Sequence, residues 1–96
     1  MYLSRYDFAG DPDTVHSALS RVLEKIPTDD VLLNIAVRTE SGVSLFDACP
    51  DRDTFVAFST SDEFKTLLAE AGLSAPTITP LGDVLSTVVS QNAVPA

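Results

Sequence analysis

The chain has 96 residues, of which 45% are hydrophobic and 21% charged, and a formal net charge of −8 at pH 7. This length and composition indicate one globular domain rather than two domains or a disordered segment. The acidity argues against binding to nucleic acid or to an anionic membrane surface, and the single cysteine excludes an internal disulfide and any multi-cysteine metal site.

The N-terminal third predicts a strand followed by a helix. Residues 1–8, "MYLSRYDF", are rich in aromatic side chains and are typical of a first strand. A helix should follow, because Asp11 can cap it, Pro12 suits the first helical position and Pro27 ends it. Its predicted buried stripe has apolar residues at helical spacing: Val15, Ala18, Leu19, Val22 and Ile26.

The same N-terminal residues bear on localisation. They lack the basic and apolar regions of a signal peptide. No apolar run in the chain approaches the roughly 20 residues of a membrane span. We therefore expect a cytoplasmic protein that has no membrane partner.

The middle of the chain predicts a hairpin and two helices. Residues 31–38, "VLLNIAVR", and 43–49, "VSLFDAC", read as two strands joined by the turn 39–42. Asp51 is a suitable cap for a short helix containing Phe55 and Phe58. A second helix begins in the Ser/Thr/Asp cluster 59–62 and stops at Gly72, and it should bury Phe64, Leu67, Leu68 and Ala71.

The C-terminal part completes the predicted fold. Residues 73–80, "LSAPTITP", are too rich in proline for a helix and indicate a connector, and residues 81–90 predict a fourth strand. Residues 91–96 predict a loose tail after a single domain of residues 1–90. The predicted fold class is α+β: a ferredoxin-like β-α-β-β-α-β plan with a four-stranded antiparallel sheet.

The hairpin register sorts its side chains onto two faces. If residues 39–42 form the turn, the numbers of facing residues sum to 81, so that Asn34 lies opposite Asp47 and Leu32 opposite Cys49. The second face is more uniformly apolar, and we expect the helices to cover it. The first face mixes aliphatic and polar residues, and we expect a second copy to cover it, leaving a semi-polar cavity in a homodimer. The first face holds Leu32, Asn34, Ala36, Arg38, Val43, Leu45, Asp47 and Cys49, and the second holds Val31, Leu33, Ile35, Val37, Ser44, Phe46 and Ala48.

These features resemble the dimeric α+β barrel superfamily, which includes antibiotic-biosynthesis monooxygenase-like domains and many small bacterial proteins. The resemblance covers most of residues 2–89. It implies a ferredoxin-like homodimer and, in the monooxygenase branch, cofactor-independent oxygenation of a phenolic substrate. It rests on the order of elements and on a loose pattern of residues, which here are Asn34, Gly42, Asp47, Cys49, Asp51, Phe55 and Phe58.

Two departures from the pattern bear on activity. Many relatives have His where Asn34 stands and Trp where Cys49 stands, and this chain contains no Trp. The haem-degrading branch uses an Asn, Trp and His set, which the chain does not match, since its one His lies on the first helix. The resemblance therefore implies no haem cofactor.

Six residues are candidates for ligand binding. Asn34 and Asp47 either satisfy each other across the strands or present polar groups to a ligand. Cys49 is more simply a packed or pocket-lining residue than a nucleophile, since nearby carboxylates oppose thiolate formation. The remaining candidates are Arg38 at a strand end, His16 at the helix edge, and Leu32 opposite Cys49.

Two hypotheses about function remain open. In the first, the homodimer binds a flat apolar or aromatic, polyketide-like molecule, and oxidises or rearranges it without a cofactor. In the second, the same fold is a non-catalytic structural or regulatory module whose interior has no cavity of ligand size.

Overall fold

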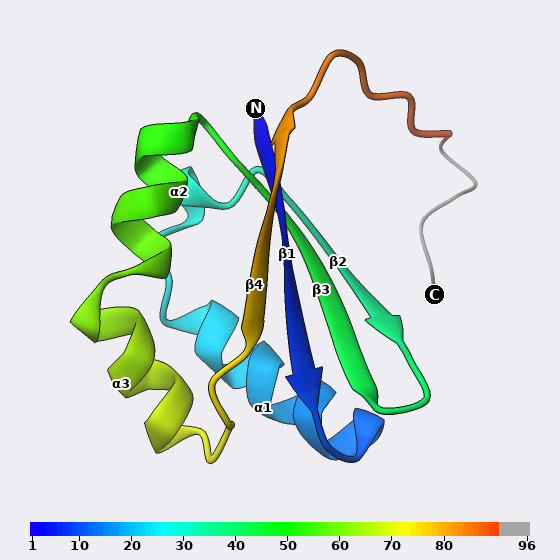
Figure 1. Ribbon diagram of the computed structural model, residues 1–96, viewed down its shortest axis with the longest axis vertical. Coiled ribbons are helices and arrows are strands. Elements are labelled where there is room, and N and C mark those ends of the chain that lie inside the picture. The colour runs from blue at the N-terminus through cyan, green and yellow to red at the C-terminus, as the bar shows by residue number, and fades with distance from the viewer. Residues whose placement is uncertain (91–96) are drawn as a thin grey trace.

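A computed structural model describes residues 1–90 of the chain. The elements follow one another as β1 (Tyr2–Ala9), α1 (Pro12–Glu24), a short 3₁₀ turn (Thr28–Asp30), β2 (Leu33–Arg38), β3 (Gly42–Cys49), α2 (Arg52–Ser59), α3 (Asp62–Glu70) and β4 (Thr77–Asp83). The four strands form one sheet in the order β2-β3-β1-β4, and every neighbouring pair is antiparallel. The predicted ferredoxin-like α+β fold is therefore confirmed, and the two helices predicted between β3 and β4 are both present (Figure 1).

Local sequence signals set the helix starts. The side chain of Asp11 accepts a hydrogen bond from the backbone N–H of Thr14 at 3.0 Å, and Pro12 is the first residue of α1. Asp51 caps α2 in the same way, through the N–H of Thr54 at 2.7 Å. The predicted apolar stripe is buried throughout, although α1 ends before its last member: Val15, Ala18, Leu19 and Val22 lie in α1, and Ile26 follows it.

The hairpin register is as predicted. Asn34 faces Asp47 and Arg38 faces Val43. Gly42 makes the neighbouring β1–β3 contact possible, because a Cβ added there would lie 1.9 Å from the carbonyl oxygen of Phe8.

The prediction of which face the helices cover is wrong. The helices cover the face with Val43, Leu45, Asp47 and Cys49, all of which are buried. The reason lies in β1, which is a central strand: Tyr2 pairs with Cys49, Tyr6 with Leu45 and Phe8 with Val43. Burying these aromatic rings against the helices outweighs burying the aliphatic residues of β2, an edge strand. The core contains these rings with residues of all three helices: Val15, Leu19, Val22, Phe55, Phe64 and Leu68.

The opposite side of the sheet has no helix over it (Figure 1). We call it the open sheet face. It includes the apolar residues Ile35 and Val37, which are 48% and 41% exposed. By strand register, it consists of Leu3, Arg5, Asp7, Leu33, Ile35, Val37, Ser44, Phe46, Ala48, Thr77 and Thr79.

The predicted position of the last strand is also wrong. β4 spans Thr77–Asp83, within and just after the stretch predicted to be a connector. Pro80 fits there because β4 is an edge strand that pairs only with β1, and the register shifts next to it. Residues 84–90, predicted to be strand, have no regular secondary structure. The predicted tail, 91–96, lies outside the described residues.

Candidate functional site

The candidate site lies between the sheet and the helices. A small, partly open cavity of about 30 Å³ lies there, lined mostly by aromatic and aliphatic side chains. That volume suffices for one or two water molecules and not for a metabolite. Three of the predicted site residues, Asn34, Asp47 and Cys49, line it together, although on the covered side of the sheet rather than on the open one.

The cavity has a wall that reaches the surface. Among its lining residues, several keep partial exposure, and they belong to the end of α1, the connection into β2, and α2. An opening for a larger molecule would therefore lie between the segment 25–32 and α2. The partly exposed lining residues are Leu23, Asp30, Val31, Asn34, Thr54 and Phe58.

Asp47 is the buried acidic group of the cavity. It is only 8% exposed, and the amide of Asn34 donates a hydrogen bond to its Oδ1 at 3.5 Å, the long end of the range. Burial raises the pKa of Asp47 above its ordinary value, and the hydrogen bond from Asn34 opposes this in part. The protonated form of the Asp47 carboxyl is therefore more favoured than it would be in water.

Tyr6 is the polar cavity residue that the sequence alone did not reveal. It is 2% exposed, and its hydroxyl is the one buried side-chain polar atom among the described residues that has no hydrogen-bond partner. The hydroxyl of Ser4 donates to the backbone carbonyl of Asp47 at 3.4 Å, and it lies close enough to Tyr6 to lower the pKa of the phenol in part. Burial raises the pKa of Tyr6 to about 12, and the Asp47 carboxylate reinforces the shift, so the phenol stays protonated and able to donate.

The pairing of β1 with β3 explains why Tyr6 lies in the cavity. Tyr6 faces Leu45, two residues before Asp47, so β1 places its hydroxyl on the same face as the Asn34–Asp47 pair. The sequence does not show which strand pairs with the first strand. Without that pairing, the side chains of the first strand cannot be assigned to one face of the sheet or the other.

Cys49 is a packed residue. It is 4% exposed, and its thiol donates weak hydrogen bonds to the carbonyl of Asp51 at 3.2 Å and to that of Tyr2 at 3.8 Å. Burial raises the pKa of the Cys49 thiol, and the Asp47 carboxylate acts in the same direction. The thiolate needed for nucleophilic chemistry is disfavoured there.

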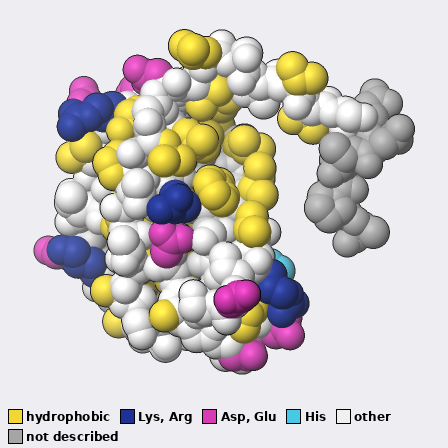
Figure 2. Space-filling view, turned by 45° about the vertical axis from the view of Figure 1, so that its right-hand side comes forward, with side chains coloured by type: hydrophobic (Ala, Val, Ile, Leu, Met, Phe, Trp, Pro, Cys, Tyr) yellow, Lys and Arg dark blue, Asp and Glu magenta, His cyan; other side chains and the backbone are white. Residues whose placement is uncertain are grey.

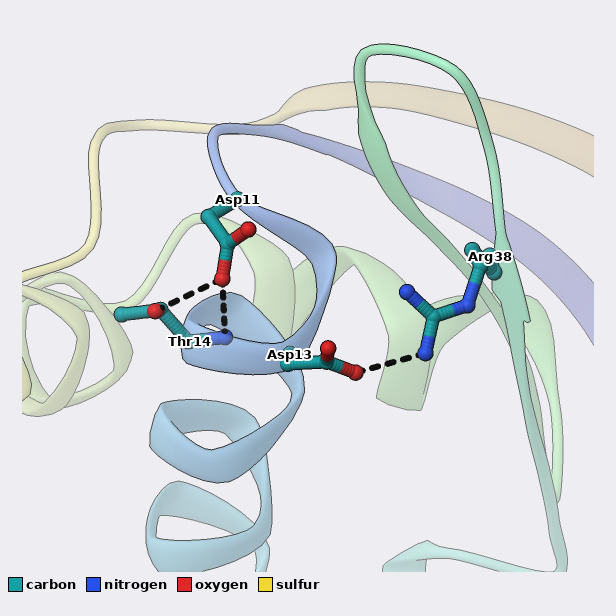
Figure 3. Close-up of polar contacts among 4 residues, drawn as sticks. All are labelled: Asp11, Asp13, Thr14 and Arg38. Atoms are coloured by element: carbon teal, nitrogen blue, oxygen red, sulfur yellow. Dashed lines mark hydrogen bonds and ion pairs between the residues drawn. The ribbon is translucent and has the colours of Figure 1, made fainter.

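The remaining predicted residues lie elsewhere. Arg38 and His16 line a shallow surface groove of about 210 Å³ between α1 and β2, where Arg38 forms an ion pair of 2.5 Å with Asp13 (Figure 3). Both partners of that ion pair are largely exposed, so the pair contributes little. Leu32 is 51% exposed and lines neither cavity nor groove.

Two further properties of residues 1–90 bear on chemistry. They contain no group of three or more His, Cys, Asp or Glu side chains arranged to hold a metal ion. Within the same residues, no helix is long and apolar enough to span a membrane.

The strand order and the helices on one side of the sheet define a ferredoxin-like α+β fold. Among solved structures it is similar to a candidate antibiotic biosynthesis monooxygenase from Chloroflexus aurantiacus J-10-fl. The TM-score is 0.63 over 93% of this chain and 98% of the other, with 8% sequence identity, so the likeness is one of fold. No protein-family model matches the sequence, and no curated protein is significantly similar to it.

Proposed function

We propose that this protein is a homodimer that binds a small, mostly apolar or aromatic molecule between its sheet and its helices. Tyr6, Asp47 and Asn34 would meet a polar group of that molecule, and the aromatic rings around them would meet its apolar part. The observation that supports the proposal best is the hydroxyl of Tyr6, which is buried without a hydrogen-bond partner in a mostly apolar cavity that Asp47 also lines.

A buried hydroxyl without a hydrogen-bond partner lowers the free energy of unfolding by about 1–3 kcal/mol, so a bound molecule that supplies a partner would be stabilised there. A ligand hydroxyl or carbonyl that accepts from Tyr6 would supply one. The cavity has a volume of only about 30 Å³, so binding of a metabolite requires the opening between segment 25–32 and α2 to widen.

The ligand test uses thermal shift with a panel of phenolic and polycyclic aromatic compounds. A binder should raise the melting temperature of the wild type and raise that of Tyr6→Phe by clearly less. Tyr2→Phe is the matched control, because Tyr2 is a buried tyrosine of the same strand that does not line the cavity. If no compound shifts the wild type, or if both variants respond equally, the proposed site is wrong.

Oxidation of the bound molecule is the activity suggested by the structural similarity to the candidate monooxygenase. Dioxygen would be the oxidant, and the substrate would have to be a phenol that can give up a proton and an electron. The ionised carboxylate of Asp47, which lies buried in the cavity, would accept the proton, and dioxygen would accept the electron. Oxygen consumption by the wild type but not by Asp47→Asn, with a compound that binds both, would support this activity; its absence would leave a binding protein.

The second copy is proposed because of the open sheet face. It exposes Ile35 and Val37, and its charges are one basic and one acidic side chain, Arg5 and Asp7, which pair at 3.1 Å. The rest of the chain is strongly acidic, so this face is the neutral, apolar part of a surface that otherwise repels copies of itself. Around a twofold axis, the Arg5 and Asp7 of two copies can also interact reciprocally.

The dimer is tested by sedimentation velocity. Ile35→Asp should convert a micromolar dimer into a monomer by burying a charge at the interface. Val56→Asp is the control, because Val56 lies on α2 and is similarly exposed at 39%. A wild type that is monomeric at 100 micromolar concentration contradicts the dimer.

The second candidate function is a non-catalytic interaction module with the same fold. The small volume of the cavity favours it, since a tightly filled interior is what that hypothesis predicts. The two candidates differ in the panel experiment: the module dimerises as described but shows no compound-dependent shift.

A further inference from the structure

The carboxyl group of Asp47 has no cationic partner among residues 1–90. It is buried, and its side chain takes part in one hydrogen bond, the long one from the Asn34 amide. Neither of the two ion pairs found in the same residues includes it, since these are Arg5–Asp7 and Arg38–Asp13. A buried charge is stable when a group of opposite charge compensates it. Nothing in the described part of the chain does this for an ionised Asp47.

The basic side chains of the protein all lie outside the cavity. None of the six lysines and arginines is buried, and Figure 2 shows such side chains, in dark blue, on the outer surface of the molecule. Within residues 1–90, no Lys, Arg or His lines the cavity, whereas a second acid, Asp30, lines its partly exposed wall. The cavity is therefore electronegative and repels carboxylates and phosphates.

The aromatic lining of the cavity also suits a cation. Aromatic rings pack against apolar groups and attract a cation placed over a ring face. The rings belong to β1, α2 and α3, and they contact one another, with the centroids of Phe58 and Phe64 4.5 Å apart. A cation with an apolar body therefore matches this lining better than a neutral polar molecule does. The aromatic lining residues are Tyr6, Phe8, Phe55, Phe58 and Phe64.

Tyr6 offers a second polar contact to the same group. Its hydroxyl is buried and has no hydrogen-bond partner among the described residues. Burial and the Asp47 carboxylate both raise the pKa of Tyr6, so the hydroxyl and the carboxyl lie close together. A primary ammonium group has three N–H donors, and the carboxylate and the phenol oxygen can each accept from it.

The cavity has room for such a group as it stands. An ammonium group is about as large as a water molecule, and the cavity of about 30 Å³ holds one or two waters. Only the apolar body of the molecule requires the opening between segment 25–32 and α2 to widen.

We propose that the molecule bound between the sheet and the helices is a primary amine with an apolar or aromatic body, whose ammonium group pairs with the ionised Asp47 carboxylate and donates to the Tyr6 hydroxyl. This inference rests on the proposed ligand site and adds the charge and the chemical class of the ligand. A neutral alcohol or phenol can donate to Asp47 but leaves its charge uncompensated. An anion is repelled by Asp47 and Asp30.

The test compares three aromatic compounds of similar size and different charge: 2-phenylethylamine, 2-phenylethanol and phenylacetate. Their dissociation constants are measured by titration of protein NMR chemical shifts at pH 8, where the amine is protonated and the acid is ionised. The amine should bind at least tenfold more tightly than the alcohol, and phenylacetate should give no saturable shift.

Two variants assign the preference to Asp47. Asp47→Asn keeps the shape of the side chain and removes its charge, so the amine and the alcohol should then bind equally. Asp53→Asn, on the exposed side of α2, changes the net charge by the same amount and should keep the preference of at least tenfold.

The contrary outcomes are distinguishable. An alcohol that binds as tightly as the amine, or an Asp47→Asn variant that keeps the preference, overturns the ammonium pairing and leaves a ligand site in place. The same holds if the amine does not bind while a phenol of the thermal-shift panel does. If neither these three compounds nor the panel bind, the proposed ligand site and this inference fail together.

Discussion

The hydroxyl of Tyr6 should cost stability in the ligand-free protein. It is buried without a hydrogen-bond partner among the described residues, whereas its ring contacts Phe55 and Phe64 with centroids 6.5 and 5.8 Å away. Tyr6→Phe keeps these ring contacts and removes the unsatisfied group. We expect it to raise the free energy of unfolding by about 1 kcal/mol in urea denaturation. A loss of stability instead would show that an internal water or a retained ligand satisfies the hydroxyl.

Asp47 makes a pH-dependent contribution to stability. Burial raises its pKa in the folded protein above the unfolded value, so folding favours the protonated carboxyl. Stability from this group is fully present below the unfolded pKa and is lost as the pH rises through the folded pKa. Asp47→Asn should therefore stabilise the protein at pH 7, by about 1 kcal/mol, and have little effect at pH 3.

The measurement is the free energy of unfolding at intervals from pH 3 to pH 8. Asp53→Asn, on the exposed side of α2, is the control for a simple change of net charge. If Asp47→Asn destabilises the protein at pH 8 and has little effect at pH 3, the ionised carboxylate is a structural partner of Asn34 and not a strained group.

Between secondary-structure elements, the side chain of Ser61 links the end of α2 to the start of α3. Its Oγ accepts from the N–H of Phe64 at 3.1 Å, which caps α3, and donates to the carbonyl of Phe58 at 2.8 Å, near the end of α2. Ser61→Ala should cost about 1 kcal/mol of unfolding free energy, measured by circular dichroism in urea. Ser59→Ala is the control, because that hydroxyl is exposed and makes one long contact of 3.5 Å to Val56. Equal costs for the two variants would contradict a special role for Ser61.

The helices and the hairpin were predictable because their signals are local. Asp11, Asp51 and Ser61 each lie at a helix start and bond there as the capping pattern predicts. The turn 39–42 alone sets the hairpin register.

The facing of the sheet and the position of β4 were not predictable in this way, because both depend on which strand is central. The aromatic residues of β1 decide the buried face only once β1 pairs with β3. Pro80 excludes a central strand but not an edge strand, and the sequence does not show which place β4 takes. The candidate site also combines local features, which were predictable, with long-range ones, which were not. The opposition of Asn34 and Asp47 is local and was predicted, whereas the approach of Tyr6 to that pair depends on the β1–β3 pairing.

The net charge of the whole molecule should govern how the proposed dimer responds to salt. Two copies of charge −8 repel each other, whereas the open sheet face carries one Arg5 and one Asp7 and is neutral. The Debye length falls from about 30 Å at 0.01 M salt to about 8 Å at 0.15 M, so added salt removes most of the repulsion and leaves the apolar contact. We expect the dissociation constant to fall several-fold between these salt concentrations, as measured by sedimentation equilibrium.

A charge variant separates this effect from ion pairing within the interface. Glu24 and Glu70 lie exposed at the last positions of α1 and α3, in the helix layer away from the open sheet face. Changing both to Gln lowers the negative charge of each copy by two without altering the face. The variant should dimerise more tightly than the wild type at 0.01 M salt and equally at 0.15 M, because screening already removes the difference there. A wild-type dimer that weakens as salt is added would instead mean that reciprocal Arg5–Asp7 pairs outweigh the repulsion between the two acidic bodies. Arg5→Gln should then reverse the salt dependence, because only the repulsion remains.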